Sequence, residues 1–139
     1  MPTKQAFLDT NGWLALLNSS DALHSAAAAT WENLVRQSYS IILTDWIVAE
    51  TGNGLARTVA RSRFAAAVEL VQLSPRARII PVSEHLFWQA LDLYTKRPDK
   101  TWGLVDCASF VLMEEEGIRE AFTNDHHFQQ AGLTCLLPL

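Results

Sequence analysis

Four acidic residues lie against short apolar segments that are far apart in the chain. They are Asp9, Glu50, Asp106 and Asp125. A carboxylate beside buried apolar residues is costly unless a partner compensates its charge. If the four converge in the fold, they repel one another unless a cation lies between them, and oxygen ligands favour a hard divalent metal ion. The pattern therefore predicts a metal site suited to phosphodiester chemistry.

The segments around these acids predict strands that alternate with helices. Apolar and β-branched runs predict strands at 6–9, 39–43, 77–82, 120–123 and 133–137. Periodic apolar positions predict helices at 22–36, 59–73, 83–96, 104–116 and 127–131, together with a helix that starts at 44–45 and carries Glu50. We expect a three-layer α/β domain with a largely parallel central sheet flanked by helices. Because ligands of such sheets bind beyond the carboxyl ends of the strands, the acids can meet at one edge.

Length and composition narrow the possible classes of protein. A chain of 139 residues, 49% of them hydrophobic, predicts a single domain over 1–139. Its apolar stretches are interrupted well before the ~18 residues that a membrane span needs, and its first residues lack a signal-peptide core. Two cysteines make neither a disulfide framework nor a metal knuckle. We therefore expect a protein of the reducing cytoplasm.

The charge is unevenly distributed along the chain. The net charge is −4, yet the segment 57–100 carries eight basic and four acidic residues. An acidic protein can still bind RNA when a metal offsets the clustered acids and a basic segment meets phosphate. Within this segment Arg57, Arg61 and Arg63 are the best RNA or partner candidates because they follow Glu50 closely. The alternative is a solvated helix surface.

Four motifs in order resemble those of a known family. They are Phe-Leu-Asp-Thr-Asn at 7–11, Thr-Asp-Trp-Ile-Val-Ala-Glu-Thr at 44–51, Trp-Gly-Leu-Val-Asp-Cys-Ala-Ser-Phe at 102–110 and Ala-Phe-Thr-Asn-Asp-His-His-Phe at 121–128. The last motif continues through 129–133. Each motif alone is weakly specific, but their order and spacing cover nearly the whole chain. The chain resembles PIN-domain ribonucleases, in particular the VapC-like toxins of type II toxin–antitoxin pairs.

The resemblance implies specific roles for the residues within these motifs. It implies a metal site for Mg²⁺ or Mn²⁺ made by Asp9, Glu50, Asp106 and Asp125. Thr10 matches a hydroxyl residue that orients Asp9 or a metal-bound water. The resemblance further implies an RNA substrate, a cognate antitoxin protein and a homodimer. Many relatives carry Ser and Thr near Gly103 and Val105, so polar contacts before Asp106 are lost here.

Each of these residues also has a plain structural interpretation. Asp106 can be an acid of a helix first turn, Asp125 a helix N-cap and Glu50 a surface residue. His126 and His127 suit capping or core packing better than zinc binding, because no other His or Cys lies at a ligand spacing. Trp102, in the loop before Asp106, is a candidate for stacking on a base.

Two other classes of function remain open. In an aspartyl-phosphate phosphotransferase or phosphatase, Asp9 would be the nucleophile. Haloacid-dehalogenase-like enzymes, however, require a second Asp at the position where this chain has Asn11. A non-catalytic PIN-like interaction module would have a degenerate or blocked site, and four intact acids argue against it. Nucleotide-dependent functions lack support because the chain has no glycine-rich phosphate loop.

Overall fold

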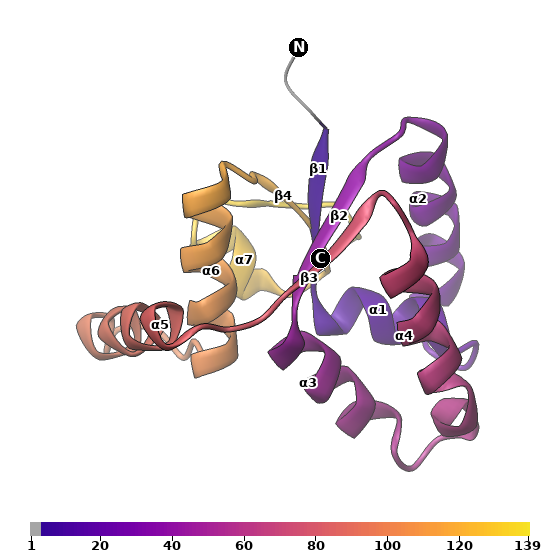
Figure 1. Ribbon diagram of the computed structural model, residues 1–139, viewed down its shortest axis with the longest axis horizontal. Helices are drawn as coiled ribbons and strands as arrows, with labels where there is room; N and C mark the ends of the chain where they lie inside the picture. Colours follow the sequence, from indigo (N-terminus) through magenta and orange to yellow (C-terminus); the bar gives the residue numbers. More distant parts are fainter. Residues whose placement is uncertain (1–3) are drawn as a thin grey trace.

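Five parallel strands form the central sheet of the computed structural model, which describes residues 4–139 (Figure 1). The strands are β1 (Gln5–Leu8), β2 (Ser40–Thr44), β3 (Ala77–Ile80), β4 (Glu120–Phe122) and β5 (Thr134–Cys135). Their order across the sheet is β3-β2-β1-β4-β5, and every neighbouring pair is parallel. The carboxyl ends of all five strands therefore lie at the same edge of the sheet.

Helices cover both faces of this sheet. They are α1 (Thr10–Leu17), α2 (His24–Arg36), α3 (Asp45–Leu55), α4 (Phe64–Leu73), α5 (Glu84–Lys96), α6 (Leu104–Glu116) and α7 (His126–Gln130), with a 3₁₀ turn η1 (Val59–Arg63) before α4. Helices α1, α2 and α4 lie to one side of the sheet and α5, α6 and α7 to the other, while α3 extends beyond the carboxyl ends of the strands (Figure 1). Within residues 4–139, none of these helices is long and apolar enough to cross a membrane.

The three-layer arrangement with a parallel sheet confirms the predicted fold class. The helix predicted at 104–116 has these bounds, and the other strand and helix ends shift by a few residues. The helix predicted at 59–73 divides into η1 and α4, because Thr58 caps a short 3₁₀ turn by accepting a hydrogen bond from the backbone N–H of Ala60.

The core of the protein is built on the middle strand. Ala6, Phe7 and Leu8 of β1 are fully buried, as expected for a strand that is covered by helices on both faces. Phe122 on β4 and Phe128 on α7 are also fully buried, and the Phe128 ring lies 6.3 Å from that of Phe7. The chain therefore emerges from the centre of the core at the point where β1 ends.

Gly12 allows α1 to lie directly against β4. A Cβ atom at this position would lie 2.0 Å from the carbonyl oxygen of Phe122, far inside contact distance. We expect Gly12→Ala to lower the free energy of unfolding by about 3 kcal/mol or more, because backbone cannot move aside as a flexible side chain can. Urea unfolding followed by circular dichroism measures the effect. Gly103→Ala is the control, since its Cβ would meet nothing closer than 4.0 Å; equal midpoints for the two variants would contradict the prediction.

Candidate active site

The register of β1 against β4 places Asp9 beside Thr123. Leu8 pairs with Phe122, so the residues that follow them leave the sheet side by side. The Thr123 hydroxyl donates a 2.8 Å hydrogen bond to Oδ2 of Asp9 and accepts one of 3.0 Å from the backbone N–H of Asp125. Asp9 is only 4% exposed. Its carboxylate is therefore fixed in orientation inside the protein.

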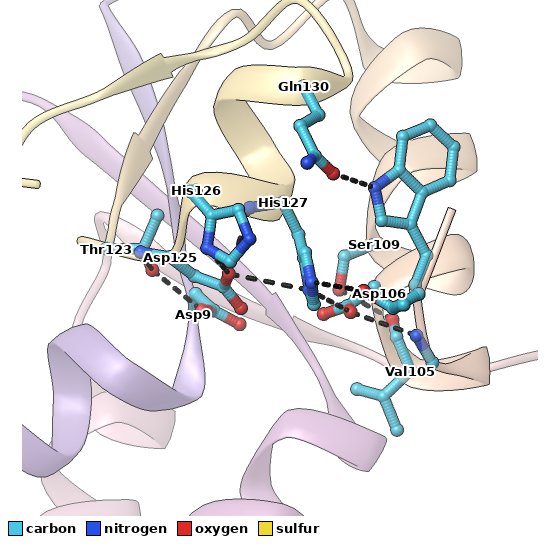
Figure 2. A network of polar contacts seen from close by, with 12 residues as sticks. Asp9, Val105, Asp106, Ser109, Thr123, Asp125, His126, His127 and Gln130 are labelled. Carbon is cyan, nitrogen blue, oxygen red and sulfur yellow. Dashed lines mark hydrogen bonds and ion pairs between the residues drawn. The ribbon is translucent and has the colours of Figure 1, made fainter. Parts of the chain in front are cut away.

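Asp106 reaches the same region from the first turn of α6. Its Oδ2 accepts a 3.1 Å hydrogen bond from the backbone N–H of Gly103 and lies 3.1 Å from Nδ1 of His127. The same Nδ1 lies 3.5 Å from Oδ1 of Asp125, so His127 connects the two carboxylates (Figure 2). On its other side, Nε2 of His127 lies 3.2 Å from the Thr101 hydroxyl. This arrangement suits the tautomer that carries its proton on Nδ1.

The three aspartates influence one another electrostatically. Burial, reinforced by the carboxylates of Asp106 and Asp125, raises the pKa of Asp9 to about 7 despite its hydrogen bond from Thr123. Burial and the neighbouring Asp125 also raise the pKa of Asp106. Within residues 4–139, no Lys or Arg forms a salt bridge with any of the three. The cluster thus combines oxygen ligands with an uncompensated negative charge, which a divalent cation would satisfy.

Glu50 lies next to Thr10, the residue that follows Asp9 in the chain. The Thr10 hydroxyl, at the start of α1, donates a 2.5 Å hydrogen bond to Oε1 of Glu50 on α3. Glu50 is exposed, whereas Thr10 is buried. The resemblance implied that the Thr10 side chain orients Asp9 or a water; in the structure its hydroxyl contacts Glu50, and Thr123 contacts Asp9.

The plain structural interpretations of two acids are also correct. Oδ1 of Asp125 accepts a 2.9 Å hydrogen bond from the backbone N–H of His127 and so caps α7. Asp106 lies in the first turn of α6 and accepts from Gly103. These contacts hold the two carboxylates in place without using all their oxygen lone pairs. Capping and metal binding are therefore compatible in the same residues.

Sequence reasoning missed His127 and Thr123 as members of this cluster. The expectation that His127 serves capping or packing overlooked that α7 turns its ring towards Asp106. Donor atoms of Asp125, His126 and His127 lie within 4.8 Å of one another, close enough to hold a metal ion. Thr123 could have been found from its position directly after β4 and two residues before Asp125. For His127 the sequence carries no such signal, because its contact depends on how α7 packs against α6.

Trp102 is not available for base stacking, so that expectation is wrong. Only 6% of its surface is exposed. Its indole N–H donates a 3.0 Å hydrogen bond to Gln130, and its ring packs edge-on against Phe110 with 5.0 Å between centroids. Arg97 covers the ring from outside. Trp102 therefore ties the loop before α6, which also carries Gly103, to α7.

The fold and the acidic cluster agree with a match to a family model. The PIN domain model matches residues 6–133, and the chain belongs to this family. The 23S rRNA-specific endonuclease VapC20 of Mycobacterium tuberculosis, in strains CDC 1551 / Oshkosh and H37Rv, is 30% identical over 132 residues, which are 95% of this chain and 98% of the relative.

Solved structures give the same result. The crystal structure of Mycobacterium tuberculosis VapC20, described as a Sarcin-Ricin loop cleaving toxin, matches with a TM-score of 0.84 and 28% identity, over 96% of this chain and 99% of that one. VapBC2 from Rickettsia felis, bound to a DNA fragment from their promoter, matches with a TM-score of 0.67 and 16% identity over 94% and 96% of the two chains. The second likeness shows the fold alone.

The raised pKa of Asp9 predicts an unusual dependence of stability on pH. Because the folded protein holds this proton up to about pH 7 and the unfolded chain releases it near pH 4, metal-free stability should fall as pH rises between these values. The shift corresponds to at most about 4 kcal/mol. We expect Asp9→Asn, which keeps an acceptor for Thr123, to be more stable than the wild type at pH 8 in EDTA, and the difference to shrink towards pH 4. Urea unfolding across this range measures it; an equal or lower stability of the variant at pH 8 would contradict it.

Proposed function

We propose that this protein is a metal-dependent endoribonuclease and the toxin of a toxin–antitoxin pair. The observation that carries the proposal is the group of three aspartates, linked by Thr123 and His127, without a Lys or Arg partner among the described residues. Membership of the PIN-domain family and the 30% identity to an endonuclease of 23S rRNA support the reaction and the substrate class. We expect the whole chain, 1–139, to act as one catalytic domain in the cytoplasm.

The donor set fits a hard divalent ion. We propose that Asp9, Asp106 and Asp125 hold Mg²⁺ or Mn²⁺, while Glu50 binds a second ion or positions a water. Three or four carboxylates supply oxygen ligands, and the nearby imidazole of His126 would favour Mn²⁺ over Mg²⁺. When bound, the ion would lower the pKa of a water and stabilise charge on the phosphate.

The side chains around the acids position them for this role. Thr123 fixes the Asp9 carboxylate through its hydroxyl, and Thr10 does the same for Glu50. His127 keeps Asp106 and Asp125 close together although both are negatively charged. Burial of Asp9 keeps bulk water from one side of the site, which strengthens the attraction between the carboxylates and a cation.

The proposal predicts RNA cleavage that requires metal and Asp9. The purified protein, freed of any antitoxin, should cleave 23S rRNA with Mg²⁺ or Mn²⁺, and EDTA should stop the reaction. Asp9→Asn should lower the rate by at least about 10² because it removes a ligand from the ion. Product bands on denaturing gels measure cleavage. Glu69→Gln, an exposed acid on α4, is the matched control and should cleave like the wild type.

Two results would contradict this prediction. Cleavage in EDTA, or full activity of a folded Asp9→Asn protein, would rule out the metal-dependent mechanism. A phosphorylated Asp9 trapped with a small phosphodonor would instead support the aspartyl-phosphate alternative. A folded wild type that binds RNA without cleaving it under any metal would support the non-catalytic interaction module.

We propose an antitoxin as the protein partner, and an apolar groove as its docking site. The groove, with a volume of about 370 Å³, lies between α1, α2 and α4, and Trp31, Leu34 and Leu70 line it. Leu70 is 71% exposed, and an exposed apolar groove suits the apolar face of a partner helix. The description of VapC20 as a toxin supports this choice of partner. We also expect a homodimer, for which exposed Trp88 and Tyr94 on α5 are candidates.

A charge in the groove should separate inhibition from catalysis. We expect Leu70→Glu to weaken binding of the small protein encoded beside this chain's gene by at least about tenfold, because a carboxylate would be buried against apolar side chains. Metal-dependent cleavage by the variant should persist in the presence of that protein. Isothermal titration calorimetry measures binding of that protein, and the cleavage assay measures inhibition. Unchanged inhibition of Leu70→Glu would place the docking site elsewhere, and Glu69→Gln again serves as control.

A further inference from the structure

An acidic site that cleaves RNA must attract a polyanion in spite of its own charge. The basic side chains that can do so are those without a carboxylate partner. Of the eleven Lys and Arg residues, all of which lie in the described part of the chain, four form salt bridges: Arg78, Lys96, Arg97 and Lys100. The other seven are Lys4, Arg36, Arg57, Arg61, Arg63, Arg76 and Arg119.

Four of these seven residues lie at the edge of the sheet opposite the acids. Lys4, Arg76 and Arg119 directly precede β1, β3 and β4, and Arg36 ends α2 before β2. In a parallel sheet these positions are at the amino ends of the strands, opposite the edge where the acids meet. Lys4 and Arg76 also contact groups of the turn before β2, Gln37 and Ser38. They therefore do not lie at the edge where a phosphate would meet Asp9.

The remaining three define one segment on the side of the acids. We call Arg57, Arg61 and Arg63 the arginine loop; they lie between α3 and α4. Helix α3 starts at the carboxyl end of β2 and runs away from the sheet, so that the loop lies beyond the edge that carries the acids (Figure 1). No acidic residue occurs between Glu50 and Glu69, so the positive charge of the loop is not offset locally.

Contacts with α1 fix the distance between the loop and the acids. Phe64, directly after the loop, packs on Trp13 with 5.6 Å between ring centroids, and Gly54 lies against Leu14. Helix α1 begins at Thr10, next to Asp9, and its eight residues span about 12 Å. The loop therefore lies within a few nucleotides of the acids along a bound strand.

The loop presents its arginines from a fixed backbone. Leu55 and Ala60 are buried, each 1% exposed, and anchor the segment to the core. Thr58 donates to the carbonyl of Leu55 and accepts from the N–H of Ala60. The Arg57, Arg61 and Arg63 side chains are all exposed, and one donor of Arg61 is used in a 3.1 Å hydrogen bond to the carbonyl of Ala56. Exposed guanidinium groups on an ordered backbone are well suited to bind phosphate oxygens.

We propose that the arginine loop binds the phosphates of the substrate RNA next to the scissile bond. The proposal rests on the proposed ribonuclease function and adds the surface that supplies affinity. Phosphate contacts position a nucleic acid without reading its sequence. The loop therefore governs how tightly RNA binds and how strongly binding depends on salt, while the acids govern bond cleavage.

The test compares two triple variants with the same change of charge. One carries Arg57→Gln, Arg61→Gln and Arg63→Gln; the control carries Lys4→Gln, Arg36→Gln and Arg76→Gln at the opposite edge. Binding of a short fluorescein-labelled single-stranded RNA is measured by anisotropy in the Asp9→Asn background, so that cleavage does not interfere. We expect the loop variant to raise Kd at least about tenfold and to flatten the slope of log K against log salt by about 2. The control should change both much less.

Kinetics and a charge-retaining variant complete the test. In protein that retains Asp9, the Gln variant of the arginine loop should have a higher KM for RNA than the wild type and a kcat within about twofold of it. A variant with Arg57→Lys, Arg61→Lys and Arg63→Lys should keep most of the wild-type affinity. This result would show that the Gln variant loses affinity through lost charge and not through misfolding. Equal effects of the two Gln triples, or an unchanged Kd, would overturn the proposal. Lost antitoxin binding with unchanged RNA binding would assign the loop to the partner instead. The ribonuclease function itself is tested separately: it would be contradicted if the wild type showed no metal-dependent cleavage.

Discussion

The carboxylate of Asp9 is buried at the end of the central strand without a basic partner, and the rest of the site is arranged around it. Its neighbours β2 and β4 are parallel to β1, so the residues that follow them must also leave the sheet at this edge. Burial raises the pKa of Asp9 to about 7, so ionising this carboxyl group at neutral pH lowers the stability of the metal-free fold. Such a carboxylate is unfavourable for folding, which makes a structural role an insufficient explanation of its presence.

The hydrogen bonds around Asp9 form a chain that crosses several elements. Thr123 connects it to the turn after β4, and His127 connects that turn to α6 through Asp125 and Asp106. Thr10, the next residue after Asp9, connects to Glu50 on α3. Four acids from separate parts of the sequence are thus held by two threonines and one histidine. Because each link joins two elements, the geometry of the site depends on the packing of the sheet and not on any single loop.

The sequence allowed much of the fold to be predicted but less of the site. The run at 6–9 is apolar because β1 is covered on both faces, and the acids after strands indicated the edge where they meet. The division of 59–73 into η1 and α4 was not predictable, because Thr58 suits a cap and a loop equally. Nor were the partners of individual side chains: Trp102 lies in a loop of the sequence but is buried by α6 and α7, and His127 reaches Asp106 across 21 residues.

Charge is separated across the sheet in a way that suits a polyanionic substrate. The acids at the carboxyl edge would repel RNA, and four of the unpaired basic residues lie at the amino edge, where Lys4 and Arg76 bond to the turn before β2. Helix α3 resolves this conflict because it holds Glu50 against Thr10, beside Asp9, and then extends to the arginine loop. One helix thus joins the part of the site that suits a metal to the part that suits phosphate. The attraction between the arginine loop and RNA decays over about 10 Å at 0.1 M salt. This distance is comparable to the length of α1, which lies between the arginine loop and the acids.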